Sequence, residues 1–425
     1  MNALPKPEFL SAIQNMLDAY EPDAPLFFAT PSHTLLAQDI IERVPHADEP
    51  LGARVQRALA QAREQGHDDA AVVGAVPFDV ERPAALSVVR AMLRGGPLGD
   101  VQASPPAAHR YDSRAVPPGD DYAAAVAQAV ASIRAGHLDK VVLARTLELT
   151  GAQPVDVRAL IERLAARNPH GYTFSVDVGD GRTLLGASPE LLISRFQGVM
   201  RANPLAGSAP RSSDPVEDRR RAEALLASAK DLDEHRVVVD AVKESLAPFC
   251  KKLVVPARPS LVHTQTMWHL STEVTGETSA DALTLALALH PTPAVCGYPR
   301  SAAREAILRA EPFDRGFYAG TLGWVDARGD GEWIVTIRCA EARGRTLRLF
   351  AGAGVVGDSR PAAELAETAA KFRTMLDAMG VDRTAEIDAT DAADATDATD
   401  ATDATDATDA TDAADAADAA SRIVA

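Results

Sequence analysis

Cysteine is scarce in this sequence, and long hydrophobic runs are absent. The three cysteines, Cys250, Cys296 and Cys339, have no metal-site spacing and cannot all pair with one another, which favours free thiols in a reducing compartment. The longest apolar stretches, at 70–78 and 282–289, fall well short of the roughly 20 residues that span a bilayer. The N-terminal residues also lack the basic start and continuous apolar stretch of a signal peptide. The sequence therefore predicts a soluble cytoplasmic protein with no membrane partner.

Negative charge is abundant, but most of the excess lies in one repeat. The chain of 425 residues carries a net charge of -17, and eleven aspartates fall between positions 388 and 418. Without these eleven charges the net charge is -6, which is ordinary for a soluble domain and does not indicate a nucleic-acid partner. The repeat has a period of three and almost no large apolar residue, so residues 385–425 are predicted to be a disordered tail. Such a tail is either a dispensable repeat expansion or a partner-binding segment.

Periodic patterns elsewhere predict a mixed α+β fold. Helices are expected at 1–20, 122–135 and 155–168, and strands at 140–149, 173–178 and 191–196. Alternation at 333–339, followed by a turn at Gly344 and a run at 346–351, predicts a hairpin. A stretch rich in proline and glycine at 82–118 is expected to separate an N-terminal sheet region from the rest.

A further helix is predicted to begin near Pro361. Asp358 or Ser359 can cap it, and proline suits a first turn. Its expected buried stripe consists of Leu365, Ala369, Phe372, Leu376 and Met379, and a different face carries Glu364, Glu367 and Lys371. These charges can simply complement the helix dipole and pair four residues apart.

Three more charged residues stand in distinctive local settings. Lys140 lies in Asp-Lys-Val-Val-Leu-Ala-Arg, Glu190 ends Leu-Gly-Ala-Ser-Pro-Glu, and Glu234 lies in Ser-Ala-Lys-Asp-Leu-Asp-Glu-His. Taken singly, Lys140 reads as edge protection of a strand and Glu190 as a strand-start carboxylate. Glu234, one turn after Lys230, reads as half of a solvated ion pair.

Together, these blocks resemble the chorismate-utilising enzymes in order and spacing from about residue 27 to residue 376. Within that family the details are most similar to isochorismate synthases. The resemblance implies one large domain at 1–384, built from two stacked, mainly antiparallel sheets with helices outside and an active site in the cleft. Residues 1–118 form its less distinctive N-terminal sheet region, and residues 119–384 carry the catalytic motifs.

The resemblance also implies catalytic and metal-binding roles. Members of the family that use water carry lysine where those that use ammonia carry glutamine, so Lys140 is expected to act as the base that deprotonates water. Glu190 is expected to be the acid that protonates the departing C4 hydroxyl. Glu234, Glu364 and Glu367 are expected to hold Mg²⁺, a hard cation that prefers carboxylate oxygens and retains several waters.

Other positions match the substrate-binding blocks of the family. Ala206 stands where members that capture substrate covalently have lysine, so covalent capture is not expected here. Val295 and Tyr318 depart from the leucine and phenylalanine that are usual in siderophore-type enzymes, which leaves the product open. The substrate-binding residues implied are Gly207, Ser208, His269, Ala294, Val295, Tyr318, Arg338, Gly352 and Lys371.

The activity implied is magnesium-dependent conversion of chorismate to isochorismate, with water added at C2 and the C4 hydroxyl lost. Salicylate synthase, which goes on to eliminate pyruvate, is the nearest enzymatic alternative. Anthranilate synthase fits less well, because Lys140 replaces glutamine and no glutaminase segment or glutaminase partner is indicated. A non-catalytic chorismate-binding scaffold is a further alternative. The product could serve siderophore, salicylate or menaquinone synthesis, and Gly-Ala-Val-Pro-Phe-Asp at 74–79 is most similar to siderophore-type enzymes.

Overall fold

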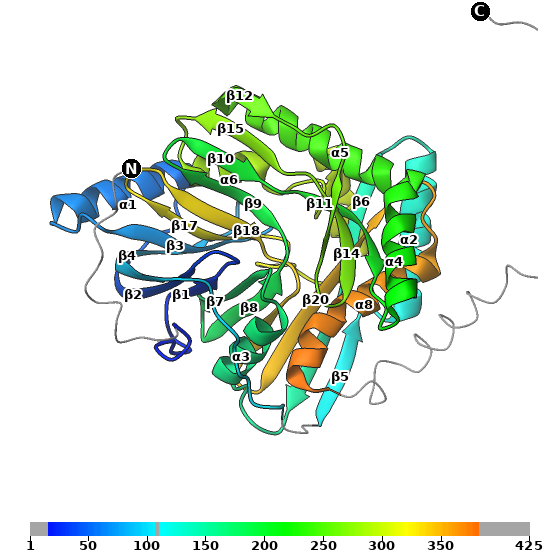
Figure 1. Cartoon of the computed structure of the whole chain (residues 1–425), viewed down its shortest axis with the longest axis horizontal. Coiled ribbons are helices and arrows are strands. Elements are labelled where there is room, and N and C mark those ends of the chain that lie inside the picture. Colours follow the sequence, from blue (N-terminus) through cyan, green and yellow to red (C-terminus); the bar gives the residue numbers. More distant parts are fainter. Residues whose placement is uncertain (1–15, 107–109, 382–425) are drawn as a thin grey trace, which may run out of the picture.

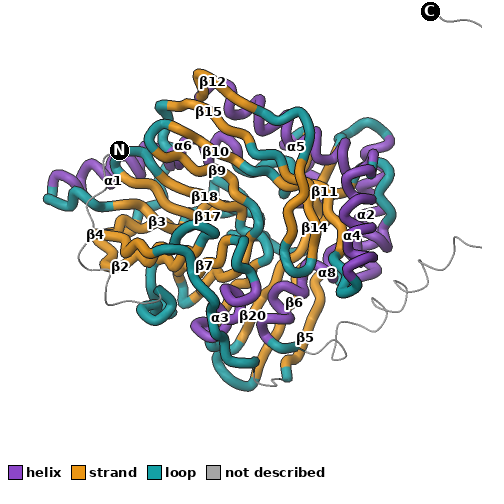
Figure 2. Tube along the Cα trace, in the orientation of Figure 1, coloured by secondary structure: helices purple, strands orange, loops and turns teal. Residues whose placement is uncertain are grey.

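The structure is a computed structural model that describes residues 16–106 and 110–381. Most of the helix expected at 1–20, and the whole tail expected at 385–425, lie outside the described residues. Within them, strands form the interior of the molecule and helices lie at its periphery (Figures 1 and 2). No helix of the described part is long and apolar enough to cross a membrane.

Two antiparallel sheets of unequal size organise the described residues. The smaller has three strands, in the order β11 (Leu205–Pro210), β14 (Met267–Ser271) and β13 (Ser260–His263). The α+β class and the antiparallel pairing are thus confirmed, although most strands join a single hydrogen-bonded network. The larger sheet contains β1 (Leu26–Ala29), β2 (Thr34–Arg43), β3 (Ala71–Val76), β4 (Ala85–Gly95), β5 (Tyr111–Val116), β6 (Lys140–Gly151), β7 (Tyr172–Gly179), β8 (Arg182–Ser188), β9 (Leu191–Phe196), β10 (Val199–Ala202), β12 (Cys250–Val254), β15 (Val274–Thr278), β16 (Gly297–Tyr298), β17 (Thr321–Asp326), β18 (Gly331–Val335), β19 (Cys339–Arg343) and β20 (Thr346–Val355).

Helices cover the outside of the sheets, as Figure 1 shows for α2, α4, α5 and α8. The expected helices at 122–135 and 155–168 are confirmed as α2 and α3. The α-helices of the described residues are α1 (Leu51–Glu64), α2 (Gly119–Arg134), α3 (Val157–Arg167), α4 (Pro215–Ala227), α5 (Ala229–Leu246), α6 (Ala282–Leu289), α7 (Arg300–Ala310) and α8 (Pro361–Met379).

Strand β6 is the central element for the site. Its near-continuous valine, leucine and threonine sequence is typical of a strand that is covered on both faces, and ten of its twelve residues are buried. It pairs with β20 so that Val142 faces Gly354 and Ala144 faces Gly352. This register brings the start of β6 against the glycine-rich end of β20.

The strand expected at 333–339 is interrupted. β18 ends at Val335 and β19 begins at Cys339, so the prediction of one continuous alternating strand was wrong. Between them, Arg338 has a φ of 52°, a left-handed conformation that is rare outside glycine and that breaks the strand. The hairpin around Gly344 is present, formed by β19 and β20.

Helix α8 begins at Pro361 as expected, but its cap differs from the prediction. Arg360 is the N-cap and makes no side-chain capping bond, whereas Ser359 bonds to Glu364. Phe372, Leu376 and Met379 are buried as expected. The other two members of the predicted stripe are only half-buried, because Glu364 and Thr368 take the deepest positions of the first turns.

The segment at 82–118 does more than separate two regions. It supplies β4, which pairs with β2 and β3, and β5, which pairs with β6. Both strands therefore belong to the large sheet that also contains β6 and β20.

Candidate active site

One cavity gathers nearly all the site residues that the sequence predicts. It contains about 620 Å³ of empty space, including its open mouth, and lies among β11, β14, β20, α5 and α8. Lys140 and Glu364 lie behind its wall, and both are almost fully buried. The remaining predicted residues line it directly: Glu190, Gly207, Ser208, Glu234, His269, Ala294, Val295, Tyr318, Arg338, Gly352, Glu367 and Lys371.

Lys140 and Glu234 form a buried ion pair at the cavity wall. Lys140 Nζ lies 2.8 Å from Glu234 Oε1, and the side chains are 1% and 10% exposed. Edge protection and a solvated pair with Lys230 are both excluded by this burial. The carboxylate of Glu234 offsets the cost of burying the ammonium, and it also lines the cavity, so it connects Lys140 to the space where a substrate would lie.

Gly354 makes room for this ion pair. A Cβ atom at position 354 would lie 2.3 Å from Glu234 Oε1 and 3.2 Å from Lys140 Cε. Any side chain there would therefore push the carboxylate away from the ammonium. Glycine at this place serves close approach, which is one of the two common reasons for glycine inside a strand.

Glu190 is a buried carboxyl group with an unusual acidity. Its side chain is 2% exposed, and Leu205 donates its backbone N–H to Oε1 at 3.5 Å. Burial raises the pKa of Glu190 to about 7, against the opposing effects of that hydrogen bond and of Lys140. A carboxylic acid with this pKa is poised to donate a proton near neutral pH.

Two glutamates of α8, Glu364 and Glu367, each form an ion pair with a lysine. Glu364 Oε1 accepts from Lys230 Nζ at 3.0 Å. Glu367 Oε1 accepts from Ser208 Oγ at 3.1 Å and also from Lys371, which donates to the carbonyl of Gly352 at 2.8 Å. Burial acts to raise the pKa of Glu367, but Lys371, Lys230 and Ser208 outweigh it and hold that pKa below its ordinary value.

The three predicted metal ligands are chemically suitable but not preassembled. Their carboxylate oxygens are the donors that Mg²⁺ prefers, and two of them with retained waters suffice. Within residues 16–106 and 110–381, however, no three acidic, histidine or cysteine side chains converge closely enough to share a metal ion. Instead Glu234, Glu364 and Glu367 each contact one ammonium group. The donor set fits the cation, provided that lysines yield to it.

Arg338 points an incompletely bonded guanidinium at the cavity. Its Nη2 donates to His269 Nε2 at 3.5 Å, and its buried Nε has no hydrogen-bond partner among the described residues. Because a guanidinium only donates, His269 carries its proton on Nδ1. Burial, with Arg338 and Lys371, holds the pKa of His269 well below its ordinary value. The unpaired Nε is thus a donor that the described residues leave available to an acceptor.

Comparison with known proteins agrees with this geometry. The family model described as "Chorismate binding enzyme" matches residues 98–380. The chain belongs to the chorismate-binding enzyme family. The matched range contains all the residues that line the cavity.

Individual relatives are similar over most of the chain. "Isochorismate synthase DhbC" of Bacillus subtilis (strain 168) is 54% identical, covering 87% of this chain and 96% of that protein. The "Vibriobactin-specific isochorismate synthase" of Vibrio cholerae is 40% identical over 87% and 95%. The crystal structure of a "putative 2,3-dihydroxybenzoate-specific isochorismate synthase, DhbC" from Bacillus anthracis superposes with a TM-score of 0.82 at 48% identity, covering 86% of this chain and 99% of that one.

Sequence reasoning missed a buried ion pair that supports this cavity. Arg315 holds both carboxylate oxygens of Glu311 and donates to the carbonyls of Val295 and Val142, at 2.8 and 2.7 Å. Glu311 also accepts from the N–H of Ala144 at 2.8 Å. The pair thus ties β6 to the loop before β16 that contains Val295. The hydrophobic pattern of the sequence does not single out these two residues, because they lie in the irregular segment that follows α7.

His235 was likewise passed over as a neighbour of Glu234. Its ring contacts the carbonyl of Ala206 at 3.1 Å and Thr272 Oγ1 at 2.7 Å. It therefore fixes the segment that carries Gly207 and Ser208 against α5. Ala206 itself lines the cavity.

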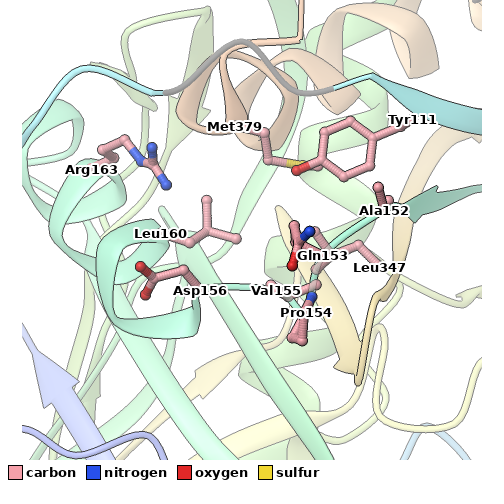
Figure 3. A pocket seen from close by; sticks show the side chains of 11 residues that line it. Tyr111, Ala152, Gln153, Pro154, Val155, Asp156, Leu160, Arg163, Leu347 and Met379 are labelled. Carbon is pink, nitrogen blue, oxygen red and sulfur yellow. The ribbon is translucent and has the colours of Figure 1, made fainter.

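A separate cavity, shown in Figure 3, contains none of the predicted site residues. Arg163 and Tyr111 approach it from opposite sides, and Asp156 lies at its edge. Asp156 accepts from the N–H of Ala159 at 3.0 Å and so caps α3. Its carboxylate therefore serves the helix.

Proposed function

We propose that this protein is an isochorismate synthase, which converts chorismate to isochorismate with the help of Mg²⁺. The observation that carries the proposal is the pairing of a buried acid, Glu190, with a buried lysine–glutamate pair, Lys140 and Glu234, around one cavity. The names of relatives that are 40 to 54% identical over most of the chain support the same activity.

The reaction exchanges one hydroxyl group for another across an allylic system. Lys140, which lies beside Glu234, reacts as the neutral amine after its own proton has passed to solvent, and it then accepts a proton from the water whose oxygen bonds to C2. Glu190 gives its proton to the C4 hydroxyl, which leaves as water while the ring double bond shifts. The numbers of atoms and protons balance, since the base gains the proton that the acid loses. Solvent exchange then restores both groups.

The two carboxylates of chorismate find cationic and N–H donors in this cavity. Arg338 offers its unpaired Nε to the enolpyruvyl carboxylate, as a guanidinium fork matches two oxygens. Gly352 keeps that part of the wall open, because a Cβ there would lie 2.7 Å from the hydroxyl of Tyr318. Lys371, which now bonds to Glu367, is the donor available to the ring carboxylate.

Glu234, Glu364 and Glu367 would hold the Mg²⁺. When bound, the cation supplies Lewis-acid stabilisation of negative charge that develops on the ring carboxylate side of the substrate. Glu367 is held as a carboxylate by Lys371 and Ser208, which keeps it in the form that binds a cation.

Product analysis tests the proposal. The full-length protein, chorismate and Mg²⁺ are incubated together, and the products are separated by chromatography. Isochorismate is the expected product. Accumulation of salicylate and pyruvate would instead favour a salicylate synthase, and absence of turnover would favour a chorismate-binding scaffold. Deletion of residues 385–425 is expected to leave turnover unchanged, which a tail-dependent scaffold would not show.

The product is proposed to feed a catecholate siderophore. The Gly-Ala-Val-Pro-Phe-Asp block at 74–79 and the description of two relatives as vibriobactin-specific and 2,3-dihydroxybenzoate-specific support this pathway. Disruption of the gene is expected to abolish catechol secretion under iron limitation. Normal secretion, with loss of menaquinone, would assign the enzyme to the other pathway.

A further inference from the structure

Lys230 lies among the carboxylates that are proposed to bind the metal ion. It lies in the first turn of α5, and its Nζ is 3.0 Å from Glu364 Oε1 in the first turn of α8. Glu364 is almost fully buried, whereas the Lys230 side chain is 34% exposed. Burial acts to lower the pKa of Lys230, but Glu364, Glu234 and Glu367 outweigh it and raise that pKa. The ammonium is therefore held by the combined charge of three carboxylates.

Lys230 differs from the other two lysines of this cluster. Lys140 is 1% exposed, and Lys371 is 13% exposed and also holds the carbonyl of Gly352. Within the described residues, Glu364 is the one group that Lys230 bonds. A lysine with one bond, a flexible stem and a path to solvent can leave at low cost.

The charge of the cluster explains why such a group is needed. Two of the carboxylates, Glu364 and Glu367, lie one turn apart on one face of α8. Burial, and after it the charge of Glu367, raises the pKa of Glu364. Without a cation nearby, burying these like charges together would be costly. An ammonium lowers that cost, yet it must be displaced before a divalent cation can take the same oxygens.

We propose that Lys230 is the internal counter-ion of the metal site: it holds Glu364 in the metal-free enzyme, leaves when Mg²⁺ binds, and thereby sets the Mg²⁺ affinity. This inference rests on the proposed magnesium dependence. It makes Lys230 a residue that tunes metal affinity without touching the reacting atoms.

The test is Mg²⁺ binding to the metal-free, full-length protein, measured by isothermal titration with MgCl₂ alone. Lys230→Met removes the competing charge and is expected to lower the Kd for Mg²⁺ by about tenfold, because the ion no longer has to displace a unit charge from Glu364. Lys243→Met is the matched control, because Lys243 is exposed in the last turn of the same helix, and it should leave the Kd unchanged. An unchanged or higher Kd in Lys230→Met would overturn the proposal.

Lys230→Arg provides a second test with the opposite sign. A guanidinium can hold both oxygens of Glu364 and is harder to displace, so the Kd for Mg²⁺ is expected to rise. Tighter Mg²⁺ binding by this variant would contradict the proposal, even where Lys230→Met fails to fold.

Failure of this inference can be told apart from failure of the proposed function. Product chromatography on the wild-type enzyme reports the reaction, whereas the titrations contain no substrate. If the wild-type enzyme forms isochorismate but the Kd for Mg²⁺ is unaltered in both variants, the counter-ion role of Lys230 is rejected and the proposed reaction is supported. A shifted Kd without isochorismate formation would support the counter-ion and reject the reaction.

Discussion

The ammonium of Lys140 meets the carboxylate of Glu234 at 2.8 Å inside the protein. One residue begins β6 and the other lies in α5, so the pair exists only when strand and helix are packed together. Local sequence favours a different partner for Glu234, namely Lys230 one turn earlier. In the structure Lys230 pairs with Glu364 instead, and Glu234 forms a buried ion pair with Lys140.

Replacing Lys140 tests its role as the base. Lys140→Met keeps the side-chain volume but removes the amine, and turnover of chorismate is expected to fall by about 10²- to 10⁴-fold. Glu234→Gln should produce a similar loss, and the double variant should lose little more than the worse single one, because the two act as a unit. Turnover of Lys140→Met within tenfold of wild type would refute the role, with Lys243→Met as the control for an unrelated lysine.

Glu190 should determine the alkaline limb of the pH profile. The acid must be protonated to act, and burial raises its pKa to about 7, so kcat/KM is expected to fall as the pH rises through about 7. Glu190→Gln should remove both that limb and nearly all turnover. A profile that stays flat from pH 6 to pH 9 would contradict the assignment.

The same raised pKa predicts a pH-dependent stability. The folded pKa of about 7 lies above the ordinary value of 4.5, so the contribution of the protonated group is fully present below pH 4.5 and is lost as the pH rises through about 7. Relative to Glu190→Gln, the wild type should lose about 3 kcal/mol between these limits, at 1.36 kcal/mol for each pKa unit. Urea unfolding at pH 5 and pH 8 measures this difference, and an equal stability gap at both pH values would argue against it.

Gly354→Ala offers a way to separate Lys140 from Glu234 while keeping both. The new Cβ would overlap the position of Glu234 Oε1, so turnover should fall by at least about tenfold. Gly357→Ala is the matched control, since its Cβ would meet only Ile133 at 3.8 Å. Equal activity in the two variants would show that the close contact has no catalytic role.

Removal of a carboxylate on α8 should weaken metal binding. Glu367→Gln is expected to raise the Kd for Mg²⁺ by at least about tenfold, since even outer-shell changes at metal sites cost 10- to 100-fold. Isothermal titration without substrate measures the effect. An unchanged Kd would remove Glu367 from the proposed ligands and leave it as the partner of Lys371 and Ser208.

The buried Arg315–Glu311 pair should matter for stability. Arg315→Met leaves the Glu311 carboxylate buried without its cation, and loss of one partner of a buried pair costs about 3–5 kcal/mol. Arg304→Met is the control, because Arg304 and Asp79 form a half-exposed pair worth about 0–1 kcal/mol. Denaturant unfolding of both variants measures the costs, and similar small values would show that the Arg315 network is dispensable.

Much of the fold and the site follows from local sequence. The valine-rich run after Lys140 predicted β6, and proline with a glutamate-bearing face predicted α8, because strand and helix periodicities are properties of neighbouring residues. The block resemblance located the cavity residues, nearly all of which the structure brings together. Local reasoning went wrong at Arg338, where a single left-handed residue ends a strand whose alternation continues in the sequence.

By itself, the sequence determined which chemical groups this protein has and the elements that carry them: an amine at the start of a strand, an acid after a serine–proline turn and carboxylates on two helices. Only the tertiary structure decided which charged groups pair. The ion pairs are Lys140 with Glu234, Lys230 with Glu364 and Lys371 with Glu367. The physical reason is that burial and Coulomb attraction depend on distances through space. Those distances are set by the packing of β6, β20, α5 and α8, whose segments lie far apart along the chain.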